Sequence, residues 1–108
     1  MLRHILATAG LAALLAGPAA AQAPIKTAVD GTFAPHAFPN LAGGGVQGFN
    51  IDLFQEVAKR LGRPIEITST QFSGIIPALN AGTYDFVAAP VTVTKERAES
   101  LLFTEGYL

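Results

Sequence analysis

The chain has 108 residues, of which 50% are hydrophobic and 14% are charged, and its formal net charge is −1. This length allows one domain at most, and a charge near zero gives no basic surface for nucleic acid, so we expect no nucleic-acid partner. The absence of cysteine excludes a disulfide framework, a cysteine-based zinc site and a thiol nucleophile.

The N-terminus has the three parts of a secretory signal peptide. Arg3 gives a positive start, the apolar run Ile5–Ala16 follows, and a Gly-Pro pair then breaks the helix before a cluster of small residues. We therefore expect residues 1–21 to be removed after export to the periplasm. The alternative is an uncleaved membrane anchor, because roughly 20 apolar residues can span a bilayer; the apolar core here is only 12 residues long.

The first half of the expected mature chain predicts a strand, a loop and a helix. Residues 25–29 alternate apolar and polar side chains and end at Asp30-Gly31, which is typical of a short strand. Residues 32–48 contain two prolines and three consecutive glycines, so we expect no regular element there. Asn50 is interpreted as an N-cap, and Gly62 as the glycine that ends the helix. The apolar stripe of that helix is Leu53, Phe54, Val57, Ala58 and Leu61.

The second half predicts two more strand–helix steps. A strand is expected over 65–69, followed by a helix that Ser73 caps and that ends at Gly82. The nearly continuous apolar run 84–90 favours a central strand covered on both faces. The last elements expected are a helical turn over 95–99, opened by Thr94, and a short strand over 101–103. Strands that alternate with helices indicate an α/β fold with a mainly parallel sheet and flanking helices.

One glycine motif resembles a nucleotide-binding fingerprint. Gly43, Gly45 and Gly48 match G-x-G-x-x-G, and Glu66 follows at about the distance of a ribose-binding acid. The fingerprint requires a strand that ends at its first glycine, and the two prolines in 34–42 are incompatible with one. We therefore interpret the motif as a flexible surface turn and expect no nucleotide or other cofactor.

Polar and aromatic residues follow the predicted strands, where ligands bind in open α/β sheets. Thr92, the helix start at Thr94 and the guanidinium of Arg97 would together suit a carboxylate. Asp30 could meet an ammonium group, and two aromatic side chains could form apolar walls around the ligand. These walls would be Phe33 and Phe72.

Each of these residues also has an interpretation without a ligand. Arg97 could be solvated or paired with Glu96 or Glu99, Asp30 could simply belong to a turn, and the two phenylalanines could be core residues. His36, the one histidine after residue 21, has no acid or second histidine at a ligand spacing. We therefore expect no metal site, and no serine nucleophile lies in a recognisable catalytic context.

Six segments together resemble the periplasmic amino-acid-binding proteins of ABC importers, the solute-binding proteins of the family 3 type. In chain order they are DGTFAP (30–35), GFNIDL (48–53), FSGIIPAL (72–79), YDF (84–86), TVTKER (92–97) and FTEGY (103–107). The resemblance covers essentially all of residues 22–108. It implies the first part of lobe one of a two-lobe, hinge-closing fold, with the second lobe absent from these 108 residues.

The resemblance also assigns roles within the site. It implies that Arg97 and Thr92 hold the α-carboxylate of a polar amino acid or similar zwitterion, and that Phe33 and Phe72 are aromatic walls. The carbonyl of Pro90 and the carboxylate of Asp30 would lie near the α-amino group or the ligand side chain. Proline at position 90 and phenylalanine at position 33 depart from the residues common in the family. These departures concern which ligand is selected.

The implied function is that of an exported monomer that performs no chemistry and delivers its ligand to an inner-membrane ABC permease. A single lobe leaves the site open to water, so weak or absent binding is expected for these 108 residues alone. Two alternatives remain open: an enzyme on the same scaffold, resembling the cyclohexadienyl dehydratases, and the extracellular sensor domain of a receptor. His36 is the one residue suited to act as a general acid in such an enzyme.

Overall fold

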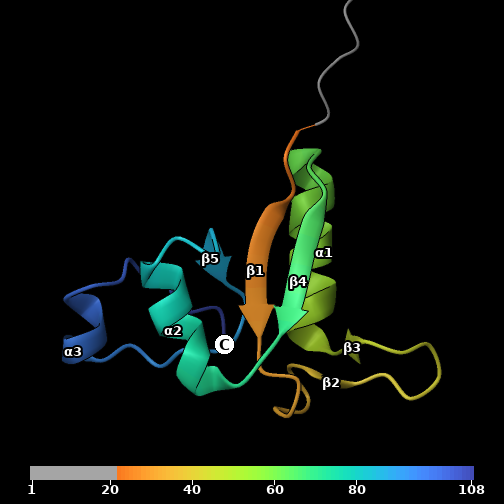
Figure 1. Ribbon diagram of the computed structural model, residues 1–108, viewed down its shortest axis with the longest axis horizontal. Coiled ribbons are helices and arrows are strands. Elements are labelled where there is room, and N and C mark those ends of the chain that lie inside the picture. Colours follow the sequence, from red (N-terminus) through yellow and green to blue (C-terminus); the bar gives the residue numbers. More distant parts are fainter. Residues whose placement is uncertain (1–21) are drawn as a thin grey trace, which may run out of the picture.

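The computed structural model describes residues 22–108, so the predicted signal peptide lies outside the described residues. Three parallel strands form the sheet in the order β4-β1-β5, with β1 (Ile25–Val29) in the middle (Figure 1). β4 (Ile65–Ser69) pairs with β1 over its whole length, and β5 (Phe86–Val87) pairs with Thr27 and Ala28. The predicted parallel α/β arrangement and the bounds of the first two predicted strands are confirmed.

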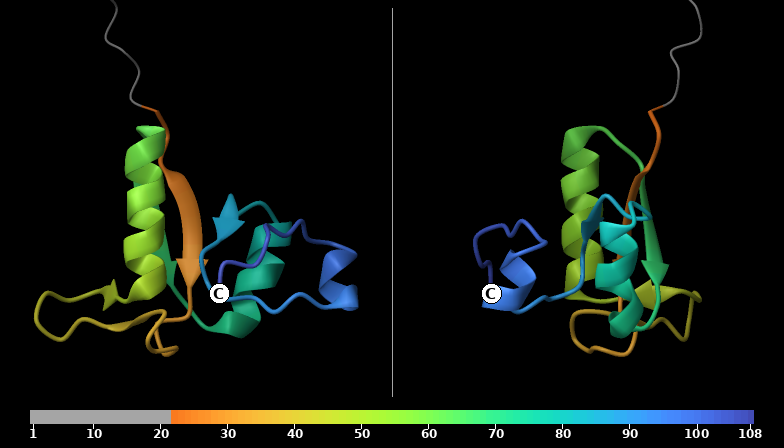
Figure 2. Two further views of the ribbon diagram at one scale, coloured as in Figure 1. Left: turned by 180° about the vertical axis from the view of Figure 1, so that it is seen from behind. Right: turned by 60° about the vertical axis from the view of Figure 1, so that its left-hand side comes forward.

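Two helices cover opposite faces of this sheet (Figure 2). Successive residues of a strand point to opposite faces, and the two buried clusters follow this rule. Val29 packs with Ile51 of α1 (Phe49–Leu61) on one face, whereas Ala28 packs with Ile75 of α2 (Phe72–Asn80) on the other. The described residues therefore form a three-layer unit with β1 in its centre. None of their helices is long and apolar enough to cross a membrane.

The start of α1 differs from the prediction. Gly48 occupies the cap position at φ 137°, and a Cβ there would lie 2.5 Å from the carbonyl oxygen of His36. The helix is thus forced to begin one residue before Asn50, so the N-cap predicted at Asn50 is wrong. Its C-terminal end is as predicted, because Gly62 is left-handed at φ 66°.

Residues 32–48 also contain regular structure that the sequence did not predict. β2 (Phe38–Pro39) and β3 (Val46–Gln47) pair as a short antiparallel ladder. The glycine motif lies in the turn of this hairpin and beyond it, where the Asn40 side chain accepts hydrogen bonds from the backbone N–H groups of Ala42 and Gly43. The strand before the motif is therefore antiparallel and two residues long, which does not fit a nucleotide fingerprint.

The cap predicted for α2 is wrong as well. The helix begins at Phe72, and Gln71, which makes no side-chain cap bond, stands at the cap position in place of Ser73. A distant residue supplies the missing acceptor: Oδ2 of Asp30 accepts the backbone N–H of Phe72 at 3.0 Å. The helix ends at Asn80, two residues before the predicted Gly82.

The segment after α2 is less regular than predicted. β5 has two residues and lies at an edge of the described sheet, not in its centre. The Thr27 hydroxyl donates to the carbonyl of Phe86 and accepts from the N–H of Ala88, which also donates to the Ala28 carbonyl. α3 (Lys95–Ala98) begins after Thr94, whose hydroxyl accepts from the N–H of Arg97 as an N-cap. The strand predicted over 101–103 is absent from the described residues, where Leu102 is fully exposed and has no strand beside it.

Candidate ligand-binding site

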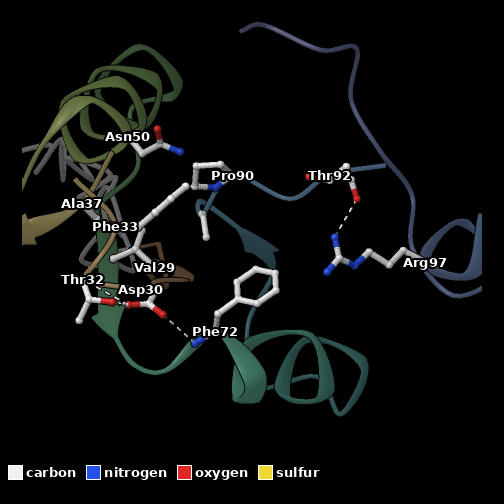
Figure 3. Close-up of a pocket in the computed structure, with 11 residues that line it drawn as sticks. Val29, Asp30, Thr32, Phe33, Ala37, Asn50, Phe72, Pro90, Thr92 and Arg97 are labelled. Carbon is white, nitrogen blue, oxygen red and sulfur yellow. Dashed lines mark hydrogen bonds between the residues drawn. The ribbon is translucent and has the colours of Figure 1, made fainter. Parts of the chain in front are cut away.

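A cavity of about 290 Å³ lies at the carboxyl ends of β1 and β5, open to solvent (Figure 3). Strand ends, the loop after β1, the N-termini of α1 and α2, and the segment through α3 all contribute to it. All six residues predicted as ligand-binding line this one cavity. They are Asp30, Phe33, Phe72, Pro90, Thr92 and Arg97, and Val29, Thr32, Ala37, Asn50 and Ala89 complete the lining.

Asp30 is held firmly at one end of the cavity. Its Oδ1 accepts the Thr32 hydroxyl at 2.6 Å and the Thr32 backbone N–H at 2.9 Å, while Oδ2 accepts the N–H of Phe72. These bonds, with the Thr32 hydroxyl first, lower the pKa of Asp30 below its usual value of 3.8, so the carboxylate is ionised at neutral pH. A carboxylate offers about four lone-pair sites, and three are used here, which leaves room for a ligand donor.

Arg97 supplies the positive end. Its Nη1 donates to the backbone carbonyl of Thr92 at 2.9 Å, and its guanidinium carbon lies 5.4 Å from the ring centroid of Phe72. Among residues 22–108 the recorded ion pair joins Arg60 and Glu56, so pairing of Arg97 with Glu96 or Glu99 is not observed. A guanidinium has five N–H donors, and most remain available to a carboxylate.

The two phenylalanines differ in their surroundings. Phe33 is 52% exposed and stacks on His36 with ring centroids 5.2 Å apart, so it is not a core residue. Phe72 is half-buried against the Ala28–Ile75 cluster and also faces the cavity, where the guanidinium of Arg97 lies over its ring. Phe72 therefore serves the core and the cavity at once.

Pro90 and Thr92 lie on the extended segment between β5 and α3. Pro90 follows the buried Ala89 and borders the cavity next to Asn50 in Figure 3. Proline has no N–H, so its carbonyl is the one backbone group it offers. The backbone of Thr92 already orients Arg97, which links the two residues predicted to hold a carboxylate.

Asn50 is the lining residue whose place the sequence analysis missed. Its side chain is fully buried, donates to the carbonyl of Ala88 and to the hydroxyl of Tyr107, and contacts His36. A signal was present, because Asn50 precedes Phe54 by four residues and so extends the apolar stripe of the helix. A polar residue at the end of a buried stripe is a candidate for an internal network rather than a cap.

Within residues 22–108, no three histidine, cysteine or acidic side chains lie close enough together to hold a metal ion. The donor set of the cavity is one carboxylate, one guanidinium, backbone carbonyls, hydroxyls and a buried amide. Opposite charges at two ends, with aromatic faces between them, suit a small molecule that carries both an anionic and a cationic group.

Comparisons with known proteins show the family to which the chain is similar. The model of the bacterial extracellular solute-binding proteins, family 3, matches residues 25–108. The octopine-binding periplasmic protein of Rhizobium meliloti is 38% identical over 97 residues, which are 87% of this chain and 32% of that protein. The chain thus spans about a third of the length of this relative.

Solved structures of amino-acid-binding proteins are similar to the described fold. An ancestral arginine-binding protein bound to glutamine matches with a TM-score of 0.75 and 37% identity, over 81% of this chain and 38% of that one. Domain 1 from TmArgBP in its arginine-bound form matches with a TM-score of 0.72 and 31% identity, over 77% and 65%. AncCDT-1, an ancestral amino acid-binding protein described as a precursor of cyclohexadienyl dehydratase, matches with a TM-score of 0.73 and 35% identity, over 79% and 37%.

The predicted resemblance is therefore confirmed: the described fold corresponds to part of the first lobe of a periplasmic-binding-protein fold, and the chain belongs to family 3 of the bacterial extracellular solute-binding proteins.

Proposed function

We propose that this chain is part of the exported substrate-binding component of an ABC importer, which binds an amino acid and delivers it to an inner-membrane permease. Membership of the family supports this role, as do relatives named as binding proteins. The observation that carries the proposal is the cavity in which Asp30 and Arg97 stand with two aromatic faces.

We assign the ligand α-carboxylate to Arg97 and Thr92. The free N–H donors of Arg97 match a carboxylate in two-pronged geometry, and the bond from Nη1 to the Thr92 carbonyl orients the guanidinium beforehand. The remaining acceptor site of Asp30 and the carbonyl of Pro90 then take the ammonium group or a polar side chain. Phe33 and Phe72 would flank the ligand.

The ligand class follows from the same groups. An ionised Asp30 and two aromatic faces favour an amino acid with a planar, nitrogen-rich side chain. The matched proteins are named for octopine and arginine, and one of them holds glutamine, which supports this class. L-Arginine is accordingly the first ligand to test.

We further propose that residues 1–21 are a signal peptide and that residues 22–108 form the first part of lobe one in a periplasmic monomer. Closure of a second lobe over the cavity would exclude water and strengthen the Arg97–carboxylate bond. The match to an arginine-bound domain 1 indicates that one lobe can hold a ligand in that relative. We therefore expect these 108 residues to bind weakly rather than not at all.

Calorimetric titration of the purified protein with L-arginine tests the proposal. Agmatine, which is arginine without its carboxylate, is the matched control ligand. L-Arginine should bind, and agmatine should bind about 10- to 100-fold more weakly, the usual size of a lost hydrogen bond to a charged group. Arg97→Met should remove this preference between the two ligands. Equal affinity for both ligands in the wild type would contradict the carboxylate assignment.

A second assay separates binding from catalysis. Incubation with prephenate should give no aromatic product absorbance, because the site is proposed to hold its ligand without a general acid. Release of product that requires His36 would replace the proposed function with an enzymatic one.

A further inference from the structure

Asn50 joins three segments that are far apart in the sequence. Its carboxamide nitrogen donates to the carbonyl of Ala88, which follows β5, and to the hydroxyl of Tyr107 at 3.2 Å. Its carboxamide oxygen lies 3.0 Å from Nδ1 of His36, in the loop after β1. With the side chain fully buried, every polar atom of this amide has a protein partner.

The partners fix the orientation of the amide. The Ala88 carbonyl can only accept a hydrogen bond, so the group that faces it must be the NH₂ of Asn50. The oxygen of Asn50 consequently faces His36, and because an amide oxygen only accepts, Nδ1 of His36 must carry the proton. The network thus specifies the Nδ1–H tautomer of His36.

Two of the linked segments carry the cavity. His36 stacks on Phe33, one aromatic face, and also makes an edge contact with Phe49 at 6.3 Å. Ala88 leads directly into Ala89 and Pro90 on the opposite side. The amide of Asn50 therefore contacts both the loop over residues 30–37 (the Phe33 loop) and the segment over residues 88–92 (the Pro90 segment).

We propose that Asn50 is a positioning residue of the ligand cavity, whose buried amide holds the Phe33 loop through His36 and the Pro90 segment through Ala88; the proposal rests on the proposed function. An amide is required, since a carboxylate would turn an acceptor toward the Ala88 carbonyl and lose both donors. The Tyr107 contact extends the same support to the segment after α3.

The isosteric variant Asn50→Asp tests the contact with His36 separately from the bonds that Asn50 donates to Ala88 and Tyr107. The carboxylate of this variant can still accept from His36, so the tautomer should be kept, while the bonds donated to Ala88 and Tyr107 are lost. Calorimetry should then show L-arginine binding about tenfold more weakly, because the Pro90 segment is no longer held through the Ala88 carbonyl. Asn80→Ala, at the exposed end of α2, is the control and should bind within about twofold of the wild type.

Nitrogen NMR of protein labelled with ¹⁵N-histidine measures the tautomer of His36 in the absence of any ligand. At mildly alkaline pH the wild type should show His36 with a protonated Nδ1 and an unprotonated Nε2, assigned by the loss of this signal in His36→Asn. Asn50→Ala should shift His36 toward the Nε2–H tautomer. A wild-type protein with the Nε2–H form would overturn the network.

A second pair of variants leaves Asn50 in place, which covers the case that Asn50→Asp does not fold. His36→Asn keeps a donor where Nδ1 stands and should retain affinity within about threefold, whereas His36→Leu, which has no donor, should lose about tenfold. A folded Asn50→Asp protein, or a His36→Leu protein, with wild-type arginine affinity would overturn the positioning role alone. A wild type that binds no amino acid would overturn the proposed function and the positioning role with it.

Discussion

The two ends of the cavity are built differently. Asp30, at the negative end, accepts three hydrogen bonds from the chain and lies at the N-terminus of α2. Arg97, at the positive end, lies on the four-residue helix α3 and makes one side-chain hydrogen bond, to a carbonyl. The negative end is thus organised before a ligand arrives, while the positive end depends on the ligand for most of its partners. The variants below test this difference.

The largest effect is expected at Gly48, which packs against the loop that begins at Asp30 and contains Pro35 and His36. Gly48→Ala places a Cβ 2.5 Å from the His36 carbonyl at φ 137°, so the loop must move. We expect a loss of about 3 kcal/mol in the free energy of unfolding, by urea denaturation. Gly44→Ala, also at positive φ but with nothing within 4 Å, is the control and should lose about 1 kcal/mol. Equal losses would mean that the loop is not closely packed.

The Thr27 hydroxyl in β1 forms hydrogen bonds with Phe86 in β5 and with Ala88 in the segment that leads to Arg97. Thr27→Val removes a buried hydroxyl and leaves the Phe86 carbonyl and the Ala88 N–H without that partner. Because the Ala88 N–H keeps its bond to the Ala28 carbonyl, we expect a loss of about 1 kcal/mol in unfolding free energy, the net contribution of a typical hydrogen bond. Thr83→Val, at an exposed position after α2, provides the control with no expected loss. A variant as stable as the wild type would show that the Ala28 carbonyl alone holds Ala88.

Asp30 is expected to make the stability of the folded chain depend on pH. Its folded pKa lies below 3.8, so it contributes stability that is fully present above that value and is lost as pH falls through the folded pKa. In Asp30→Asn the midpoint of thermal unfolding should fall at neutral pH and lose part of its dependence on acid pH. Asp52→Asn, on the exposed face of α1, serves as control. Parallel profiles for wild type and Asp30→Asn would contradict the hydrogen-bond assignment.

The smallest effect on stability is expected at the positive end. Arg97→Met removes one hydrogen bond at an incompletely buried site, and we expect a change within about 0.5 kcal/mol in unfolding free energy. A loss as large as that of Thr27→Val would show that Arg97 supports the fold and would remove the contrast between the two ends.

Local patterns predicted the parts of the fold that depend on neighbouring residues. The two alternating segments became β1 and β4, Gly62 ended α1, and the hydroxyl of Thr94 capped α3. The six residues predicted for the site also line one cavity, because the carboxyl ends of parallel strands meet at one edge; their roles toward a ligand stay a prediction. The resemblance added Pro90.

Several of the errors share one physical cause: the deciding partner is distant in the sequence. The first backbone N–H of α2 bonds Asp30, 42 residues earlier in the chain, instead of a local cap. Asn50 bonds the carbonyl of Ala88, 38 residues later in the chain. The Thr27 hydroxyl bonds the carbonyl of Phe86 in β5, 59 residues later in the chain. No window along the chain contains both members of such a pair, so neither composition nor periodicity could reveal them.

The central place of β1 also has a consequence for the order in which the chain folds. β1 is the first strand to be synthesised, yet both of its neighbours, β4 and β5, come later in the chain. Its nearest pairing partner is not made until residue 65, and every ladder that it forms closes a long loop. The hydrophobic residues of β1 therefore remain without a sheet partner until residues 65–69 have been made. The ladder between β1 and β5 can form only once residues 86 and 87 are present, so the sheet closes from its β4 side first or in a single late step.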